Sequence, residues 1–341
     1  MKRISLLVFG IILLVLIPVL AGATPAAPTV SQFDVIAAAA DEYLNDPTPE
    51  LNISSKDLLA LMLADAPYIV SSRKPEDYAT GHIPGAVNLP ESILFKPENL
   101  AKLPKDSKIV PYCYTGHSGS QVTAMLNMCG YDATNLLWGI MGWTTNTTVA
   151  NKQFSNPDTD LLTETTANQL TETYSLPTVD VTSSTNSLEI IRIACDNYAT
   201  AGLKNMKAAD LSALITDGDS SNDPTIISVR KSEDYAKGHI PGAVNIAFTD
   251  VAKKENLRKL DPGRQIVVYC YTGRTGSQAT AILNVLGYNA TNLLWGMSGW
   301  TTDPVVAAKR FDPTTSPDYP FATGAGEVVQ PTTDGGDGGC G

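Results

Sequence analysis

The sequence is poor in cysteine, and its five cysteines are too widely spaced for a familiar metal or redox motif. They include no Cys-x-x-Cys pair and no zinc-ligand spacing: Cys113, Cys129, Cys195, Cys270 and Cys340. Their odd number also argues against a fully paired disulfide framework and indicates free thiols. We therefore expect no metal site, and we ask which of the five thiols do chemistry.

Positive charge is scarce as well. Lysine and arginine number 24 against 35 aspartates and glutamates, which gives a net charge of -11. An acidic surface repels phosphate backbones, so we exclude nucleic acid as a partner. The hydrophobic fraction of 43% is ordinary for a globular protein. A chain of 341 residues is long enough for about two domains, and we expect each to bury its own core.

Long apolar runs are absent except at the N-terminus. Lys2 and Arg3 precede the apolar run 4–20, and Ala-Gly-Ala follows it, ending at residue 23. This order is typical of a secretory signal peptide, here residues 1–23. The alternative is an uncleaved membrane anchor over residues 4–20 that tethers the protein. Pro18 and the small residues favour cleavage. We expect an extracytoplasmic protein that is secreted, periplasmic or bound at the cell surface.

One long stretch of sequence occurs twice. The run that starts at Arg73 returns at Arg230, and residues 109–145 return as 266–302, an offset of 157 residues throughout. A period of this length is a whole domain, so the fold is duplicated and is not a solenoid.

The repeat boundaries predict two domains, at residues 31–154 and 187–311. Residues 155–186 are rich in Thr, Ser and Asn and are interpreted as a linker. Residues 322–341, which are rich in Gly and Asp, are interpreted as a disordered tail.

Short apolar runs alternate with a helical pattern within each copy. In the first copy, residues 68–71, 108–112 and 135–138 have the length of buried strands. Residues 120–128 have helical spacing, and Gly130 is placed to end that helix. The alternation predicts βαβ units and a parallel sheet.

Cys113 and Cys270 both stand where a predicted strand stops and a glycine-containing loop leads into a helix. Sites in parallel sheets lie at the carboxyl ends of strands. Backbone N–H groups of such a loop, together with the positive end of the helix, form an anion-binding nest. The nest suits a thiolate, a persulfide or the oxygens of thiosulfate, and it requires no metal or organic cofactor.

Two motifs, each present twice, carry a family resemblance. Gly81-His-Ile-Pro-Gly-Ala-Val-Asn, repeated from Gly238, resembles the signature of the rhodanese superfamily, and Cys-Tyr-Thr-Gly-x-[Ser/Thr] follows it at the family's distance. The resemblance covers about residues 50–150 and 205–307. It implies an α/β fold with two tandem rhodanese-like three-layer α/β/α domains, each with a parallel five-stranded sheet. It also implies a sulfurtransferase that moves sulfane sulfur from thiosulfate or a persulfide to a thiol or cyanide.

The resemblance assigns catalysis to Cys113 and Cys270. Each thiolate would attack the outer sulfur of the donor, and the backbone N–H groups of residues 114–118 or 271–275 would stabilise the persulfide. Such a covalent intermediate predicts ping-pong kinetics. The donor-binding residues expected are those of the two loops and one arginine ahead of each signature: Tyr114, Thr115, Gly116, His117, Ser118, Tyr271, Thr272, Gly273, Arg274, Thr275, Arg73 and Arg230.

Two alternatives share a reactive cysteine. A cysteine phosphatase needs an arginine six residues after the cysteine to grip the phosphoryl oxygens, but Gly119 and Gly276 occupy that place, so we exclude it. A non-enzymatic persulfide carrier or binding module that delivers sulfur to a partner protein stays open. The two intact cysteine loops favour the enzyme. Oligomeric state is left undetermined.

The two loops differ in charge. Arg274 is a fixed cation, whereas His117 in the equivalent place is mostly neutral above pH ~6.5. We hypothesise that the second site handles dianionic thiosulfate better. Pro111 also replaces Val268 in the strand before the first cysteine, where it forfeits a ladder hydrogen bond. Cys270 is therefore the safer catalytic assignment.

The remaining candidates are interpreted as structural. Family members commonly read Asp-x-Arg where this chain has serine two residues before Arg73 and Arg230, which leaves both arginines to brace the site or to pair with nearby glutamates. We expect backbone-bonded structural histidines at His82 and His239. We also expect core positions for Cys129 and Cys195, and packing against the sheet edge for Trp138, Trp143, Trp295 and Trp300. For Cys340 we favour no role over resolving a persulfide or forming an intermolecular disulfide.

Overall fold

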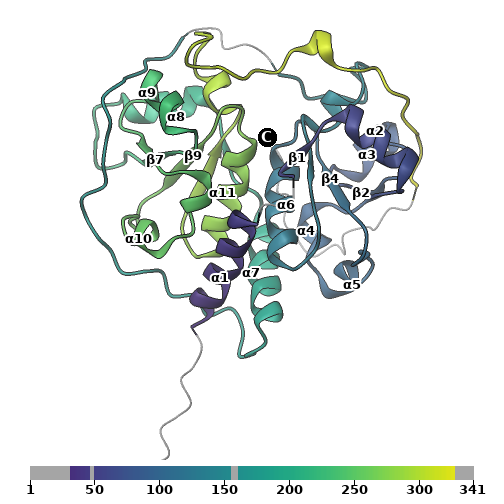
Figure 1. Ribbon diagram of the computed structural model, residues 1–341, viewed down its shortest axis with the longest axis horizontal. Helices are drawn as coiled ribbons and strands as arrows, with labels where there is room; N and C mark the ends of the chain where they lie inside the picture. The colour runs from purple at the N-terminus through teal and green to yellow at the C-terminus, as the bar shows by residue number, and fades with distance from the viewer. Residues whose placement is uncertain (1–30, 47–49, 155–159, 327–341) are drawn as a thin grey trace, which may run out of the picture. The chain divides into compact units, whose positions relative to one another are not determined.

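The computed structural model describes residues 31–46, 50–154 and 160–326 (Figure 1). The signal peptide or anchor expected within residues 1–23, and Cys340 in the expected tail, lie outside the described residues. Within the described part, the helices are all too short or too polar to cross a membrane.

Each repeat is built around parallel strands in one order. In the second repeat, five strands form one parallel sheet in the order β6-β10-β9-β7-β8. In the first repeat, β3-β2-β4 and β1-β5 form two sheets, joined by a parallel bridge between Ile109 and Ala133 that produces the same order. The strands are β1 (Asn52–Ile53), β2 (Tyr68–Ser71), β3 (Val87–Asn88), β4 (Ile109–Tyr112), β5 (Asn135–Leu136), β6 (Asn205–Met206), β7 (Thr225–Ser228), β8 (Val244–Asn245), β9 (Ile266–Tyr269) and β10 (Ala290–Leu293).

The local predictions from sequence hold well. The expected strands correspond to β2, β4 and β5, and Pro111 pairs with Val70 without interrupting β4. The helix expected over 120–128 is α6 (His117–Met128), which starts three residues earlier because Gly116, in a left-handed conformation, caps it. Gly130, with φ +79°, follows its end as predicted. The counterpart of α6 in the second repeat is α11 (Arg274–Val285).

Shorter helices complete both repeats. They are α2 (Ser55–Ala64), α3 (Pro75–Thr80), α4 (Glu91–Leu94), α5 (Pro97–Leu100) and η1 (Gly139–Gly142) in the first repeat, and α8 (Ala208–Ile215), α9 (Ser232–Lys237), η2 (Phe248–Asp250), α10 (Lys254–Leu257), η3 (Gly296–Gly299) and η4 (Pro313–Thr315) in the second.

Alternate residues of the central strands face two different cores. Val110 of β4 packs in an outer cluster with Leu58 of α2, and Val267 of β9 does so with Leu211 of α8. Ile109 lies in a larger inner cluster that draws on both repeats. That cluster includes residues of α1, α6, α7 and α11, and α6 packs directly against α11 (Figure 1). The three-layer arrangement is confirmed, but the expectation that each half buries its own core is wrong for the inner face.

The N-terminal helix of each repeat packs against the other repeat as well as against its own. Helix α1 (Gln32–Asn45) packs against η2 of the second repeat, and α7 (Ser187–Ala201) packs against α4 of the first. An ion pair also joins each helix to the other repeat: Asp34 of α1 with Lys254 of α10 at 2.9 Å, and Asp196 of α7 with Lys96, which precedes α5, at 3.0 Å. The two helices also pack against one another.

Two extended segments, which we call the arms, each dock on the repeat that they do not follow in sequence. Arm 160–168 follows the first repeat but docks on the second, where Trp300 Nε1 donates to the Leu162 carbonyl at 2.8 Å. Arm 318–324 follows the second repeat but docks on the first, where Trp143 Nε1 donates to the Pro320 carbonyl at 2.9 Å. The segment interpreted as a linker thus includes a docked arm. The expected disordered tail begins with residues held by hydrogen bonds, since Ala322 pairs with His82.

Candidate active site

The two cysteine loops have the same geometry. Cys113 directly follows β4, and its Sγ accepts a hydrogen bond from the Gly116 N–H at 3.2 Å. Cys270 follows β9, and its Sγ accepts from the Gly273 N–H at 3.1 Å. Both glycines have positive φ, +87° and +85°, which turns the backbone around the sulfur. The cysteines are 3% and 2% exposed, so each sulfur sits inside a closed turn.

A second glycine in each repeat, Gly139 or Gly296, lets a neighbouring segment pack closely against the backbone of the cysteine loop. The Ile140 N–H donates to the Cys113 carbonyl at 3.0 Å, and the Met297 N–H donates to that of Cys270 at 3.0 Å. This close approach requires Gly139, whose Cβ, if present, would lie 2.5 Å from the Cys113 carbonyl oxygen. Gly296 is equivalent. Sequence reasoning missed both glycines, although the repeated Trp-Gly after each last strand was a signal that could have indicated them.

The loop tyrosines tie each cysteine turn to a neighbouring helix. Tyr114 donates its hydroxyl hydrogen to Asp77 of α3 at 2.5 Å, and Tyr271 donates to Asp234 of α9 at 2.5 Å. Burial, with the nearby Asp234, raises the pKa of Tyr271 to about 12, so the hydroxyl remains a donor at neutral pH. These two side chains anchor the loops. Ser118 and Thr275 lie half-buried in the first turn of the following helix.

Arg73 and Arg230 are buried near the loops and make hydrogen bonds to backbone carbonyls. Arg73 donates to the carbonyls of Gly81 and Val149, the latter at 3.1 Å, and its guanidinium lies 5.7 Å from the centroid of the Tyr114 ring. Arg230 makes the equivalent contacts, including a 3.2 Å bond to the Val306 carbonyl. Each guanidinium therefore joins the signature turn to a following segment, and direct contact of either arginine with a donor stays a prediction.

The histidines of the signature turns are structural, as expected. His82 Nδ1 lies 2.9 Å from the Tyr78 carbonyl, and His239 Nδ1 lies 2.9 Å from that of Tyr235. Each imidazole stacks on the same tyrosine, at 3.8 and 3.7 Å between ring centroids. His239 also reaches arm 160–168 through the Thr166 carbonyl, at 3.0 Å.

The side chains of His117 and Arg274 reach from their own loops to the opposite loop. His117 Nε2 lies 3.2 Å from the Thr272 carbonyl, inside the second loop. Arg274 Nη2 donates to the Thr115 carbonyl of the first loop at 2.8 Å, while Nη1 donates to Thr272 at 2.6 Å. The two cysteine loops therefore face each other across the boundary between the repeats, and each inserts a side chain into the other.

Trp138 and Trp295 contact the two side chains that cross between the loops. This differs from the packing against the sheet edge that was expected for them. The Arg274 guanidinium lies 3.5 Å from the centroid of the Trp138 ring, and His117 meets Trp295 edge-on at 4.7 Å. Only Trp143 and Trp300 are core residues, each 1% exposed. The sequence pattern could not distinguish the two kinds of tryptophan because all four follow the last strand of their own repeat.

Burial lowers the pKa of both His117 and Arg274, but only His117 becomes neutral as a result. Burial, helped by the charge of Arg274, holds the pKa of His117 well below its ordinary 6.5, so the imidazole is neutral. Burial lowers the pKa of Arg274 to about 9, while the charges of Cys270 and Cys113 oppose that shift. The guanidinium remains charged at neutral pH and is a buried cation that is hydrogen-bonded to both cysteine loops.

The other described cysteines are core residues, as predicted. Cys129 and Cys195 are buried in the inner cluster, and burial holds the pKa of the Cys195 thiol well above its usual value. No cluster of three or more potential metal ligands occurs among the described residues.

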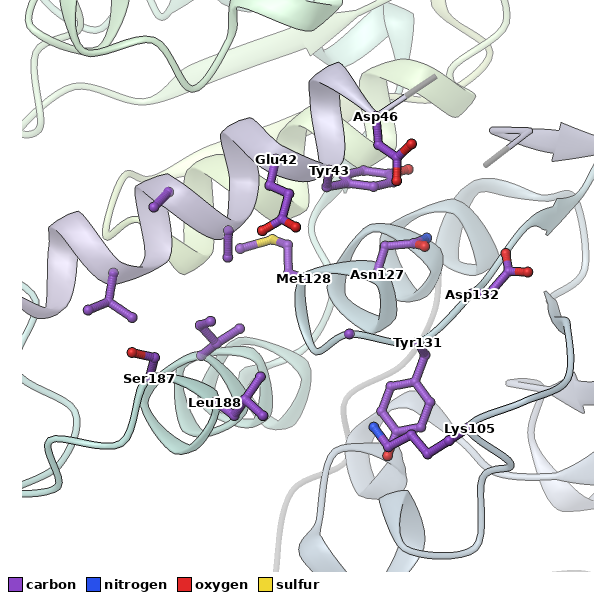
Figure 2. A pocket seen from close by; sticks show the side chains of 15 residues that line it. Glu42, Tyr43, Asp46, Lys105, Asn127, Met128, Tyr131, Asp132, Ser187 and Leu188 are labelled. Atoms are coloured by element: carbon purple, nitrogen blue, oxygen red, sulfur yellow. The ribbon is translucent and has the colours of Figure 1, made fainter. Parts of the chain in front are cut away.

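A cavity of about 780 Å³ lies between the ends of α1 and α6 and the start of α7, and no residue of either cysteine loop lines it (Figure 2). It is lined by Glu42 and Asp46 at the end of α1, by Asn127 and Met128 at the end of α6, and by Leu188 at the start of α7. Cys113 lies just before the start of α6, whereas the cavity lies at the end of α6. This helix of 12 residues, about 18 Å long, therefore separates the cavity from Cys113.

Comparison with known proteins agrees with the geometry. The chain matches the rhodanese-like domain twice, over residues 54–146 and 207–303, which is more than half of its length. The chain belongs to the rhodanese family. The match begins near the start of α2 or α8 and includes the cysteine loop in each repeat, whereas α1, α7 and both arms fall outside it.

Several curated proteins are similar to parts of this chain. A sulfurtransferase of Allochromatium vinosum is 34% identical over 96 residues, 27% of this chain and 88% of that protein. The thiosulfate sulfurtransferase PspE of Escherichia coli is 37% identical over 62 residues, 18% of this chain and 60% of PspE. YrkF of Bacillus subtilis is 30% identical over 105 residues, so the matched part of this chain spans only 56% of YrkF.

Solved structures with similar folds include a thiosulfate sulfurtransferase from Pseudomonas aeruginosa, 18% identical, with a TM-score of 0.30. The match covers 80% of this chain and 48% of that one. A rhodanese-like domain protein from Staphylococcus aureus is 29% identical, with a TM-score of 0.25 over 27% of this chain and 88% of that chain. Both TM-scores are too low to add to the fold described above.

Proposed function

We propose that this rhodanese is a sulfurtransferase that moves sulfane sulfur from thiosulfate or a persulfide donor to a thiol or cyanide acceptor. The observation that carries the proposal is the pair of matched turns, in which a glycine N–H points at the sulfur of Cys113 or Cys270. A thiolate stabilised by that N–H attacks the outer sulfur of thiosulfate, the new S–S bond forms, and sulfite leaves with the electron pair of the old one. The acceptor then takes the outer sulfur and regenerates the thiolate.

The closed loops support a small donor. With the cysteines only 3% and 2% exposed, a thiosulfate or a low-molecular-weight persulfide fits more readily than a folded partner. This favours the enzyme over the carrier that delivers sulfur to a partner protein. The proposed setting is extracytoplasmic, on the basis of the signal-like residues 1–23.

The test is thiocyanate release from thiosulfate and cyanide, with intact mass spectrometry to detect the added sulfur. We expect turnover by the wild type, reduced turnover by Cys113→Ser and by Cys270→Ser, and none by the double variant. Cys340→Ser is the control and should match the wild type. A persulfide that forms on the loops but never turns over would instead support the carrier, and absence of any persulfide would refute both.

A further inference from the structure

The guanidinium of Arg274 belongs to both cysteine loops. It starts α11, directly after the second loop, yet it donates to the Thr115 carbonyl of the first loop and stacks on Trp138 of the first repeat. Its residue is 2% exposed. The first loop has no cation of its own at the equivalent position, because His117 is neutral and inserts into the second loop.

One nitrogen of this buried cation makes no hydrogen bond. Nε of Arg274 has no hydrogen-bond partner among the described residues, although it is buried. It lies beside the first loop, 3.3 Å from the place that a Cβ on Gly116 would occupy. Gly116 is the residue whose N–H holds Cys113 Sγ. A buried donor without a partner loses about 1–3 kcal/mol relative to a satisfied one, which favours an anion at this place.

We infer that Arg274 is a shared anion-binding residue, which holds the sulfonate oxygens of thiosulfate for Cys113 as well as for Cys270. The inference rests on the proposed sulfurtransferase function and goes beyond it by naming the residue that selects a dianionic donor at both sites. From the sequence, Arg274 was expected to bind the donor at the second loop, with His117 in the equivalent place at the first. The structure instead places Arg274 against both loops.

The experiment isolates the first loop with Cys270→Ser and adds Arg274→Gln in that background. We expect the thiosulfate concentration for half-maximal persulfidation of Cys113, followed by intact mass spectrometry, to rise about tenfold or more, as expected for losing a hydrogen bond to a charged group. Arg274→His, which installs the residue that stands at the equivalent position of the first repeat, is the second variant in case glutamine disturbs folding.

The matched control is Lys108→Gln in the Cys270→Ser protein. It also removes one positive charge, but Lys108 precedes β4, at the end of the strand opposite Cys113, and pairs with Asp132 at 2.7 Å. The thiosulfate dependence of this control should equal that of Cys270→Ser, which separates a local effect from a general loss of charge.

Sulfate binding, measured by calorimetry on the same proteins, separates the inference from the proposed function. If no persulfide forms but sulfate binds and Arg274→Gln removes that binding, the sulfur chemistry fails at Cys113 and the inference stands. If persulfide forms with equal thiosulfate dependence in the presence and absence of Arg274, the inference is wrong and the function stands. If sulfate does not bind and no persulfide forms, both are overturned.

Discussion

His117 is a neutral imidazole enclosed by groups from both repeats. Its Nδ1 lies 2.8 Å from Thr115 Oγ1, its Nε2 faces the second loop, and the charged group opposite is Arg274. The pKa is lowered in the folded state because burial and that positive charge both disfavour protonation. Below about pH 6.5, His117 is therefore protonated in the unfolded chain but stays neutral in the folded chain.

The consequence is a loss of stability in mild acid. As pH falls through about 6.5, the free energy of unfolding should decrease more steeply for the wild type than for His117→Gln, which cannot take up the proton. Denaturant unfolding of both proteins at several pH values between 7.5 and 5 measures this. Parallel pH profiles would show that His117 protonates as readily in the folded protein as in the unfolded one.

Gly139 is a second position where one residue decides the shape of the loop. An added Cβ would lie 2.5 Å from the Cys113 carbonyl oxygen, and φ is +56°. We expect Gly139→Ala to destabilise the protein by about 1–3 kcal/mol and to reduce sulfur transfer at Cys113, because the loop backbone must move. Cys270→Ser supplies the background for the activity measurement.

Gly85→Ala is its control. Gly85 has a similarly positive φ of +77°, but a Cβ there would meet nothing within 4 Å. This substitution therefore carries the backbone strain without the clash, about 1 kcal/mol. If the two alanine variants lose equal stability and keep equal activity, the proximity of Gly139 to the cysteine turn has no functional consequence.

Among the elements, the strands and helices near the cysteines followed closely from local sequence, whereas the arms did not. The strand β2 was predicted to the residue, because a short apolar run bounded by polar residues is a local signal. Arm 160–168 is rich in threonine, and its partners lie far along the chain: Tyr235 is 67 residues from Asn168, and Trp300 is 138 residues from Leu162. Composition therefore suggested a linker where long-range hydrogen bonds make a docked segment.

Removing arm 318–324 tests the importance of these contacts. Tyr319 and Phe321 pack on the outer core of the first repeat, and Asp318 accepts a hydrogen bond from Thr144 Oγ1 at 2.9 Å. A chain that ends at residue 316 should lose about 2–5 kcal/mol of unfolding free energy, since two large half-buried side chains return to water. Denaturant titration measures the loss, and a chain that ends at residue 326 is the control. Equal stability of the two truncated chains would contradict a stabilising role for the arm.

The whole described chain depends on exchange between its repeats. The inner core, the helices α1 and α7, the arms and the two cysteine loops all cross the boundary. Fragment 31–154 alone lacks α7, α11 and arm 318–324, so it would expose the inner face of its sheet. Although composition predicts two domains of adequate size, neither has its inner core without the other.

We therefore expect fragment 31–154 to lack a cooperative unfolding transition, whereas mixing it with fragment 160–326 should restore one. Near-ultraviolet circular dichroism during denaturation measures both states, and the intact chain provides the reference. Cooperative unfolding of the isolated fragment, with most of the stability of the intact chain, would show that the repeats are independent domains.

The sequence by itself determined the family, the duplication, the parallel sheets and the cysteine loops, because these depend on short motifs and on local hydrophobic spacing. Only the tertiary structure decided which residues surround each sulfur. His117 and Arg274 occupy equivalent positions in their own repeats, but their side chains reach the opposite loop. That arrangement arises where α6 and α11 pack together, a contact between segments 157 residues apart that no local pattern encodes.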